Sequence, residues 1–172
     1  MPNAGTASRI GRLSWLWLSV LVLVIDQASK FYFEHGLTLY QQIVVIPDYF
    51  SWTLAYNTGA AFSFLADSSG WQRWLFALIA VVVSSVLVVW LKRLGSSETW
   101  LAVALALVLG GALGNLYDRI VLGHVIDFIL VHWQNRWYFP AFNIADSAIT
   151  VGAVMLALDM FKSKKSGEPV HD

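Results

Sequence analysis

The chain has 172 residues, of which 58% are hydrophobic and only 13% are charged, far from the composition of an ordinary soluble domain. Eleven basic and eleven acidic residues give a formal net charge of zero, so the basic excess typical of nucleic-acid binding is absent. The chain contains no cysteine, which excludes disulfides, a thiol nucleophile, thiolate metal ligands and a lipid attached to its own cysteine. Composition therefore predicts an integral membrane protein that binds no nucleic acid.

Four segments are apolar and long enough to cross a membrane, since a span needs about 20 mainly apolar residues. They cover residues 13–33, 71–91, 100–116 and 144–161. Two basic residues precede the first span, as in a signal peptide, but no Ala-x-Ala cleavage site follows it, so we expect this span to be retained. The sequence predicts one four-helix membrane domain over residues 13–161, with tails at 1–12 and 162–172.

The loop at residues 34–70 is too long to be a mere connection. Its two β-prone runs, at 42–46 and 49–56, are separated by Pro47-Asp48, a pattern typical of two strands joined by a turn. The predicted fold is thus a mainly α membrane protein with a small extracytoplasmic antiparallel β-sheet. A second outer loop, residues 120–142, is rich in Trp and Phe and is predicted to lie along the membrane interface.

Lysine and arginine near the helix ends predict the orientation, because cytoplasmic flanks carry the excess of these residues. Seven lie on one side of the predicted bundle, namely Arg9, Arg12, Lys92, Arg93, Lys162, Lys164 and Lys165. Four lie on the other, namely Lys30, Arg73, Arg119 and Arg136. Both termini are therefore predicted to be cytoplasmic.

With this topology, every unusual polar residue arrives at the outer face of the membrane. These residues are Asp26, Asn57, Asn115, Arg119, Asp127, Asn143 and Asp146. Charged groups inside membrane segments are costly, so they usually face a cavity or a partner and are candidates for a functional site. Asn115 and Arg119 are four residues apart and Asn143 and Asp146 three apart, so each pair shares one face of a helix. The sequence predicts that these side chains line a common cavity.

Each of these residues also has a simpler interpretation when taken alone. Asp127 fits an exposed loop acid, and Asp146 fits a first-turn acid at the positive end of a helix dipole. Asp26 and Lys30 fit an interfacial ion pair with a lysine that extends toward water, as well as a role on the substrate side. The run from Asn57 to Phe62 fits a turn, because Asn and Gly tolerate positive φ.

Other motifs indicate structure more than chemistry. His124 has no second imidazole at ligand spacing, so we expect a structural histidine and no metal. Ser29 and Lys30 are adjacent on a helix and do not face each other, which argues against a Ser/Lys dyad. Gly110 and Gly114 have the small-xxx-small spacing of close helix packing.

Five motifs, in this order, are similar to those of the bacterial lipoprotein signal peptidase family, also called signal peptidase II, over about residues 13–161. They are Asp26-Gln27-Ala28-Ser29-Lys30, Asn57-Thr58-Gly59-Ala60-Ala61-Phe62, Gly114-Asn115-Leu116-Tyr117-Asp118-Arg119, Val125-Ile126-Asp127-Phe128 and Phe142-Asn143-Ile144-Ala145-Asp146. The resemblance implies an aspartic endopeptidase of the bacterial inner membrane that needs no cofactor. Its substrate would be a prolipoprotein carrying diacylglyceryl-cysteine, cleaved just before that cysteine, in contact with membrane lipid, and its expected inhibitor is globomycin.

The same resemblance assigns roles to individual residues. It makes Asp127 and Asp146 the catalytic dyad, supported by Asp26. Asn57, Asn115, Arg119 and Asn143 would orient the substrate and the dyad, and Lys30 and Gly59 complete the candidate supporting set.

Two carboxylates that share a proton suit acid/base chemistry on water, because like charges a few ångströms apart do not both ionise at low cost. The alternative function is a proton-coupled transporter or channel component, in which intramembrane acids relay protons. It predicts a polar path across the membrane, whereas spans 71–91 and 144–161 are nearly pure hydrocarbon toward the cytoplasm. A non-enzymatic assembly subunit would leave Asp127, Asn143 and Asp146 unexplained.

Overall fold

The computed structural model of the chain describes residues 11–59 and 70–165, with side chains up to Phe161. The predicted tail 1–12 therefore lies largely outside the described residues, and so does the end of the second tail, residues 166–172. Arg9 and residues 60–62 of the second motif also lie outside them.

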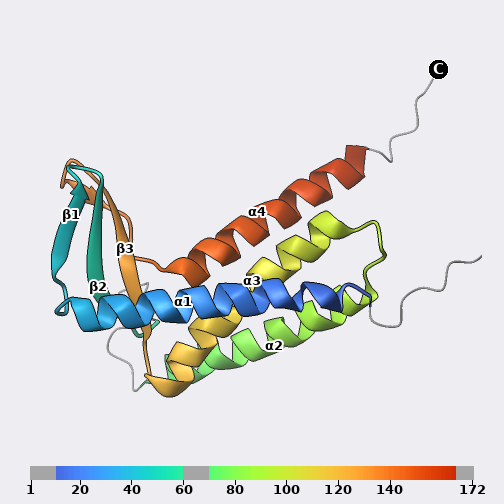
Figure 1. Cartoon of the computed structure of the whole chain (residues 1–172), viewed down its shortest axis with the longest axis horizontal. Helices are drawn as coiled ribbons and strands as arrows, with labels where there is room; N and C mark the ends of the chain where they lie inside the picture. The colour runs from blue at the N-terminus through green and yellow to red at the C-terminus, as the bar shows by residue number, and fades with distance from the viewer. Residues whose placement is uncertain (1–10, 60–69, 166–172) are drawn as a thin grey trace, which may run out of the picture.

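Helices form most of the described chain, and a small sheet stands at one end of the helix bundle (Figure 1). The helices are α1 (Leu16–Gly36, preceded by the short 3-10 helix η1, Leu13–Trp15), α2 (Trp71–Arg93), α3 (Thr99–Val121) and α4 (Ile144–Lys165). The strands are β1 (Gln42–Ile46), β2 (Phe50–Asn57), β3 (Val125–Trp133) and β4 (Trp137–Tyr138). All four long helices are apolar enough to cross a membrane, which confirms the predicted fold class.

Helix α3 lies at the centre of the bundle and packs against the other three helices. Half of its span is buried inside the protein, compared with 17–22% for the others. Glycine allows this close approach: a Cβ atom on Gly110 would lie 2.7 Å from the backbone oxygen of Ser19, and one on Gly114 would lie 2.5 Å from Oδ2 of Asp26. The small-xxx-small pair thus brings α1 onto α3, as its spacing predicts.

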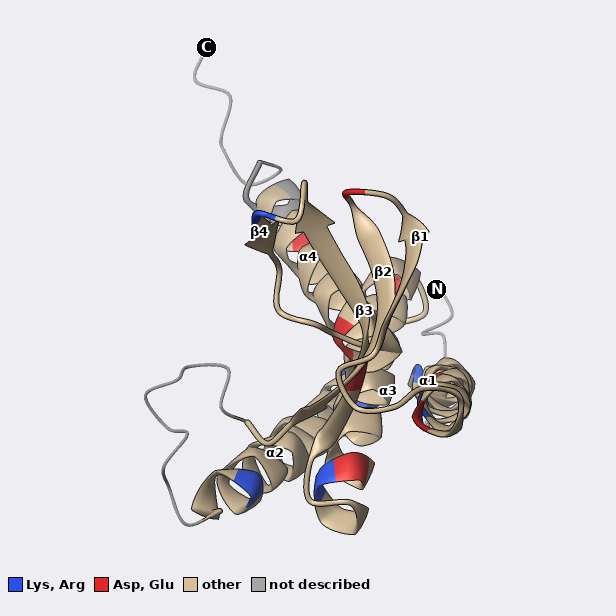
Figure 2. Cartoon of the chain, turned by 90° about the vertical axis from the view of Figure 1, so that its left-hand side faces the viewer, with Lys and Arg blue, Asp and Glu red and all other residues tan. Residues whose placement is uncertain are grey.

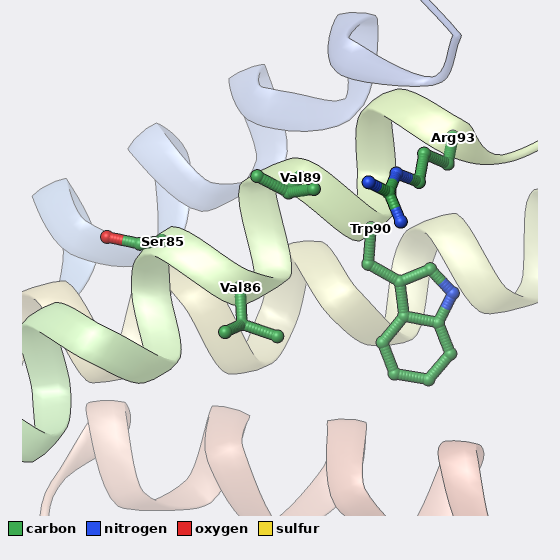
Figure 3. A pocket seen from close by; sticks show the side chains of 5 residues that line it. All are labelled: Ser85, Val86, Val89, Trp90 and Arg93. Carbon is green, nitrogen blue, oxygen red and sulfur yellow. The ribbon is translucent and has the colours of Figure 1, made fainter.

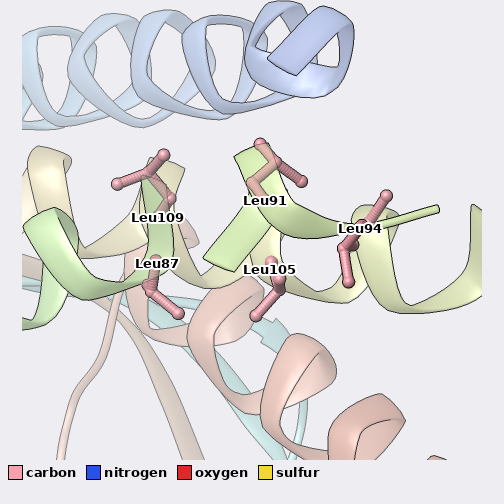
Figure 4. Close-up of a cluster of buried hydrophobic side chains, with 6 residues drawn as sticks. Leu87, Leu91, Leu94, Leu105 and Leu109 are labelled. Carbon is pink, nitrogen blue, oxygen red and sulfur yellow. The ribbon is translucent and has the colours of Figure 1, made fainter. Parts of the chain in front are cut away.

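The half of the bundle away from the sheet is held together by a leucine cluster between α2 and α3 (Figure 4). Its buried members are Leu87, Leu91, Leu94, Ala102, Leu105 and Leu109. Arg12 ties the start of the chain to this end, because its side chain donates to the backbone oxygen of Gly95 over 3.1 Å and to Thr99 Oγ1 over 2.7 Å.

The sheet has the strand order β1-β2-β3-β4, and each neighbouring pair is antiparallel. The predicted strands correspond to β1 and β2. For residues 120–142 the sequence predicts only a loop along the membrane interface. In the structure this segment forms strands β3 and β4. Because the first four residues of β3 are all buried, they lack the alternation that marks a strand with one exposed face.

Helix α3 continues to Val121, five residues past the predicted end of its span, because its polar residues face the protein interior. Asn115 and Asp118 are both buried. The helix ends where the backbone N–H groups of Leu122 and Gly123 both donate to the backbone oxygen of Asp118. Gly123 has a φ of 87°, the left-handed conformation that commonly follows a helix end. This extension carries polar side chains up to the edge of the sheet.

Candidate active site

Asp127 lies near the start of β3, where the strand pairs with β2 and Ala55 is its cross-strand neighbour. Its side chain is buried, with 2% of the residue exposed. Oδ1 accepts a hydrogen bond from the side-chain nitrogen of Asn143 over 2.7 Å, and Oδ2 accepts one from that of Asn57 over 3.1 Å. The interpretation of Asp127 as an exposed loop acid is therefore wrong.

Asp146 lies in the first turn of α4, where it forms a reciprocal cap with Asn143. The backbone N–H of Asp146 donates to Oδ1 of Asn143 over 2.9 Å, and the backbone N–H of Asn143 donates to Oδ2 of Asp146 over 3.3 Å. Such a pair satisfies donors that a helix start otherwise leaves unpaired. Asp146 thus has the first-turn structural role, but its Oδ1 also accepts a bond from the side-chain nitrogen of Asn115 over 2.7 Å. The capping role alone does not account for this contact.

Asn143 links the two carboxylates, because it caps the helix of Asp146 and donates to Asp127. Acidic positions come together where β3, α3 and α4 meet (Figure 2). Burial and, to a lesser extent, the nearby charge of Asp146 raise the pKa of Asp127 to about 7, against the opposing effects of Asn57, Asn143 and Lys30. One acid of the pair is therefore suited to holding a proton near neutral pH.

A buried ion network lies behind the carboxylates, with Lys30 of α1 at its centre. The Lys30 ammonium contacts Oδ2 of Asp26 over 2.7 Å and Oδ2 of Asp118 over 2.8 Å. It also donates to Oδ1 of Asn115 over 3.1 Å. Only 1% of Lys30 is exposed, so the interpretation of a lysine that extends toward water is wrong.

Asp26 connects this network to the helix that carries Asp146. Its Oδ1 accepts a hydrogen bond from the backbone N–H of Ala145 over 2.8 Å, so a carboxylate from α1 caps the start of α4. Gly114 leaves the space that the Asp26 side chain occupies. The fixed position of Asp146 thus depends on both α1 and α3.

Asp118 is a member of the site that sequence reasoning did not single out. Besides Lys30, it accepts hydrogen bonds from the side-chain nitrogen of Gln27 over 2.8 Å and from the backbone N–H of Ile126 over 3.3 Å. It thereby ties α1 and α3 to the strand residue that precedes Asp127. The available signal was its place in the motif with Asn115 and Arg119, at the polar end of a mainly apolar helix.

Gly59 and Asn57 form the turn that the sequence suggested, and this turn also serves the site. Gly59 has a φ of 94°, and its backbone N–H donates to Oδ1 of Asn57 over 2.9 Å. A Cβ atom at this position would lie 2.8 Å from the ring of Phe76. The bond from Gly59 turns the side-chain nitrogen of Asn57 toward Asp127.

Arg119 is half-buried on α3 beside the pair of carboxylates. It donates to the backbone oxygen of Asn115 over 3.1 Å, and its guanidinium lies 5.3 Å from the centre of the Phe76 ring. Its charge interacts with those of Asp146, Asp118 and Asp127. Within residues 11–59 and 70–165 it forms no ion pair with a carboxylate, so its N–H groups remain suited to binding a carbonyl or an anion.

A cavity of about 530 Å³ adjoins Asp146. The residues that line it are Phe139, Pro140, Ala141, Phe142, Asp146, Ser147, Thr150 and Val151. Asp146 is the only ionisable group among them, so the cavity offers one carboxylate on an otherwise mainly apolar wall. Another cavity, of about 430 Å³, lies along α2 and is lined by Ser85, Val86, Val89, Trp90 and Arg93 (Figure 3). It contains no carboxylate and is not part of this site.

The ring of His124 packs on that of Tyr56, with 4.0 Å between the ring centres, which agrees with a structural histidine. In the part of the chain that the structure describes, no three or more His, Cys, Asp or Glu residues form a group able to hold a metal ion. The site described above is built from carboxylates, amides, one ammonium and one guanidinium.

Residues 18–162 match the family model Peptidase_A8, described as signal peptidase (SPase) II. The chain belongs to the signal peptidase II family. Two relatives named lipoprotein signal peptidase, from Pseudomonas fluorescens strain Pf-5 and from Pseudomonas putida, are 87% and 86% identical over 172 residues and the full length of both chains. A third, from Pseudomonas aeruginosa strain PAO1, is 83% identical over 171 residues, which is 99% of both chains.

Solved structures agree with this membership of the signal peptidase II family. A bacterial membrane enzyme solved by the in meso method at 2.3 Å resolution has a TM-score of 0.79 and 27% identity, covering 97% of this chain and 99% of the solved one. Another, at 1.9 Å, has a TM-score of 0.77 and 30% identity, covering 87% and 93%. The chain is thus a membrane peptidase of this family.

Proposed function

We propose that this peptidase removes the signal peptide from prolipoproteins that carry a diacylglyceryl group on cysteine, cutting immediately before that cysteine, with Asp127 and Asp146 as its catalytic pair. The observation that carries the proposal is the link through Asn143, which joins two carboxylates from different elements beside a largely apolar cavity. The high identity to proteins named lipoprotein signal peptidase supports the class of substrate.

The proposed chemistry forms no covalent enzyme intermediate. The ionised aspartate takes a proton from water as the water oxygen adds to the scissile carbonyl carbon, while the protonated aspartate donates to the carbonyl oxygen. In the second step the C–N bond breaks, the leaving nitrogen receives a proton from the pair, and the new carboxyl group remains on the signal peptide. The pKa of about 7 for Asp127, raised by burial and by the charge of Asp146, supports a proton held within the pair near neutral pH.

The surrounding residues take supporting roles in this proposal. Asn57, Asn115 and Asn143 hold the carboxylates. Arg119, which forms no ion pair with a carboxylate of the described residues, binds a carbonyl of the substrate backbone. Gly59 orients Asn57, and Asp26 and Lys30 hold the helices. The largely apolar wall beside Asp146 suits a substrate whose acyl chains stay in the membrane lipid, and globomycin is expected to compete with the substrate here.

The proposed orientation places both termini in the cytoplasm and the site at the outer face of the bacterial inner membrane. Arg12 and the last turn of α2, with Lys92 and Arg93, lie at the end of the bundle away from the sheet. Lys30, by contrast, is buried in an ion network, so it does not count as a charge on the outer flank. This increases the charge asymmetry between the two sides.

The transporter alternative lacks a polar path in the described part of the chain. The polar groups gather at the sheet end, and the leucine cluster fills the opposite half of the space between α2 and α3 (Figure 4). A proton relay needs polar groups or water along its whole length.

The proposal is tested by incubating purified protein with a diacylglyceryl-modified prolipoprotein and with the same precursor before modification. We expect release of the signal peptide from the modified precursor alone, with cleavage before the modified cysteine by mass spectrometry, and inhibition by globomycin. Equal cleavage of both precursors would reject the proposed substrate class, and no cleavage of either would reject the activity.

A further inference from the structure

Three asparagines surround the carboxylate pair, and a group that can only donate fixes each amide. The backbone N–H of Gly59 donates to Oδ1 of Asn57, and that of Asp146 donates to Oδ1 of Asn143. For Asn115 the oxygen accepts from the ammonium of Lys30 over 3.1 Å and, over a longer 3.3 Å, from the side-chain nitrogen of Asn143. Since an ammonium has no acceptor, the amide end that faces it must be the oxygen.

The amide of Asn115 therefore differs from the other two in what holds it. In Asn57 and Asn143 the donor is backbone only a few residues away, so the local turn sets the orientation. In Asn115 both donors are side chains from other elements, and the shorter bond comes from Lys30 on α1. With its oxygen held by Lys30, the nitrogen of Asn115 points to Oδ1 of Asp146 at 2.7 Å.

Lys30 itself is not available to a substrate. Its three N–H donors match three acceptors, on Asp26, Asp118 and Asn115, and 1% of the residue is exposed. A buried ion network of this kind is weak evidence for stability alone, since desolvation offsets the attraction between the charges. Its contact with the asparagine that holds Asp146 gives it a role in the site.

We propose that Lys30 is a positioning residue: by holding the oxygen of the Asn115 amide, it keeps the amide nitrogen directed at Asp146 and so holds Asp146 in place to accept the proton of water. This inference rests on the proposed function. Asp127, which is almost fully buried, is then the acid that carries the proton. The charges that interact with that of Asp146 in the described chain are those of Arg119 on α3 and Asp127 on β3. Asp26 on α1 caps the same helix start, and Lys30 and Asp118 lie behind it in the ion network.

The first test replaces Lys30 with methionine, which keeps the length of the side chain and removes its donors. The Asn115 oxygen then keeps only the longer bond from Asn143, so its nitrogen is held less firmly toward Asp146. We expect kcat to fall about 10- to 100-fold, KM to change less than about threefold, and the acidic limb of the pH–rate profile to move to higher pH, because the donor to the ionised acid is held less firmly. Lys92→Met, the same change at an exposed lysine, is the matched control and leaves all three unchanged.

A double-mutant comparison separates positioning from structural damage. If Lys30 acts through Asn115, then Lys30→Met lowers kcat by less than about threefold when Asn115→Ala is already present. Full multiplication of the two effects overturns the proposal. So does a Lys30→Met variant with normal kcat, or one whose loss appears without a shift in the pH profile.

Lys30→Met leaves Asp26 and Asp118 without their cation and can prevent folding. A second variant therefore tests the same contact with Lys30 still in place. Asn115→Asp keeps an acceptor for Lys30 but has no donor for Asp146. We expect it to unfold at a temperature close to that of the wild type in detergent and to lose at least about tenfold in kcat; normal kcat here overturns the proposal whatever the behaviour of Lys30→Met. The charge-matched pair Lys30→Met with Asp118→Asn is expected to fold and to show the same loss as Lys30→Met.

The wild type and the aspartate variants distinguish failure of this inference from failure of the proposed function. If Asp127→Asn and Asp146→Asn are inactive but the losses in kcat from Lys30→Met and Asn115→Ala multiply, only the positioning role of Lys30 is rejected. If the aspartate variants remain active, the proposed catalytic pair is rejected as well.

Discussion

The side-chain nitrogen of Asn143 lies 2.7 Å from Oδ1 of Asp127 and donates a hydrogen bond to it. The same side chain accepts the backbone N–H of Asp146 through its oxygen. One amide therefore fixes the strand that carries the first acid to the helix start that carries the second. Because both ends of the amide are used, removing it affects both acids together.

Replacing Asn143 tests this double role. Asn143→Ala removes the bond to Asp127 and the helix cap, so we expect at least about a 100-fold loss of kcat and a loss of about 0.5–2 kcal/mol in the free energy of unfolding. Asn143→Asp keeps an acceptor for the cap but replaces the donor with a negative charge, so it should keep most of the stability and lose the activity. Kinetics and thermal unfolding in detergent separate the two, and an active Asn143→Asp variant would contradict the linking role.

The pKa of about 7 for Asp127 predicts the alkaline side of the pH–rate profile. Asp127 has to be protonated to donate to the carbonyl oxygen, so kcat should fall as the pH rises through about 7. A profile measured over about two pH units on either side tests this, with Asp159→Asn, a change at the far end of α4, as the control. A flat profile across that range would rule out Asp127 as the acid.

The same raised pKa predicts a cost in stability. Between the ordinary pKa of 3.8 for an aspartate and the raised pKa of about 7 for Asp127, the folded state keeps a proton that the unfolded state has lost. Stability therefore falls as the pH rises through this window. Asp127→Asn removes the buried charge, and we expect it to raise the unfolding temperature more at about pH 8 than at about pH 5. The opposite order would mean that the charged form of Asp127 is favoured by the fold.

Alanine substitutions at Gly114 and at Gly36 test the packing of Asp26, with Gly36 as the control. A Cβ atom on Gly114 would lie 2.5 Å from Oδ2 of Asp26, whereas one on Gly36 would meet nothing within 4 Å. Gly114→Ala should cost about 1–3 kcal/mol of unfolding free energy and reduce kcat, because Asp26 caps the helix of Asp146. Gly36→Ala should be neutral or slightly stabilising. Equal effects of the two changes would show that this close approach is unimportant.

The sequence predicted the four helices because each is a long apolar run, and it predicted β1 and β2 because a turn separates two β-prone runs. It missed β3 because burial of its first residues removes the alternation that a surface strand shows. It also ended span 100–116 too early, because hydropathy counts the polar residues of α3 as exposed although Asn115 and Asp118 face the interior.

For the site, the sequence predicted that these polar residues gather at one end of the helix bundle, but it did not predict their contacts. Asp118 was passed over, since nothing local shows that its carboxylate reaches Lys30 and the backbone of Ile126. For Lys30 the sequence left two interpretations open, an interfacial ion pair and a role on the substrate side. Its burial between two acids follows only from the packing of α1 against α3. Such contacts depend on tertiary structure, which periodicity and spacing do not specify.

The most direct measurement is single-turnover cleavage of a diacylglyceryl-modified precursor in ¹⁸O-labelled water by the wild type, Asp127→Asn, Asp146→Asn and the control Asp159→Asn. We expect the wild type and the control to release a signal peptide with one labelled oxygen in its new carboxyl group, and the two dyad variants to bind the precursor without releasing product. Release at near wild-type rate by either dyad variant would contradict water activation by this pair of aspartates.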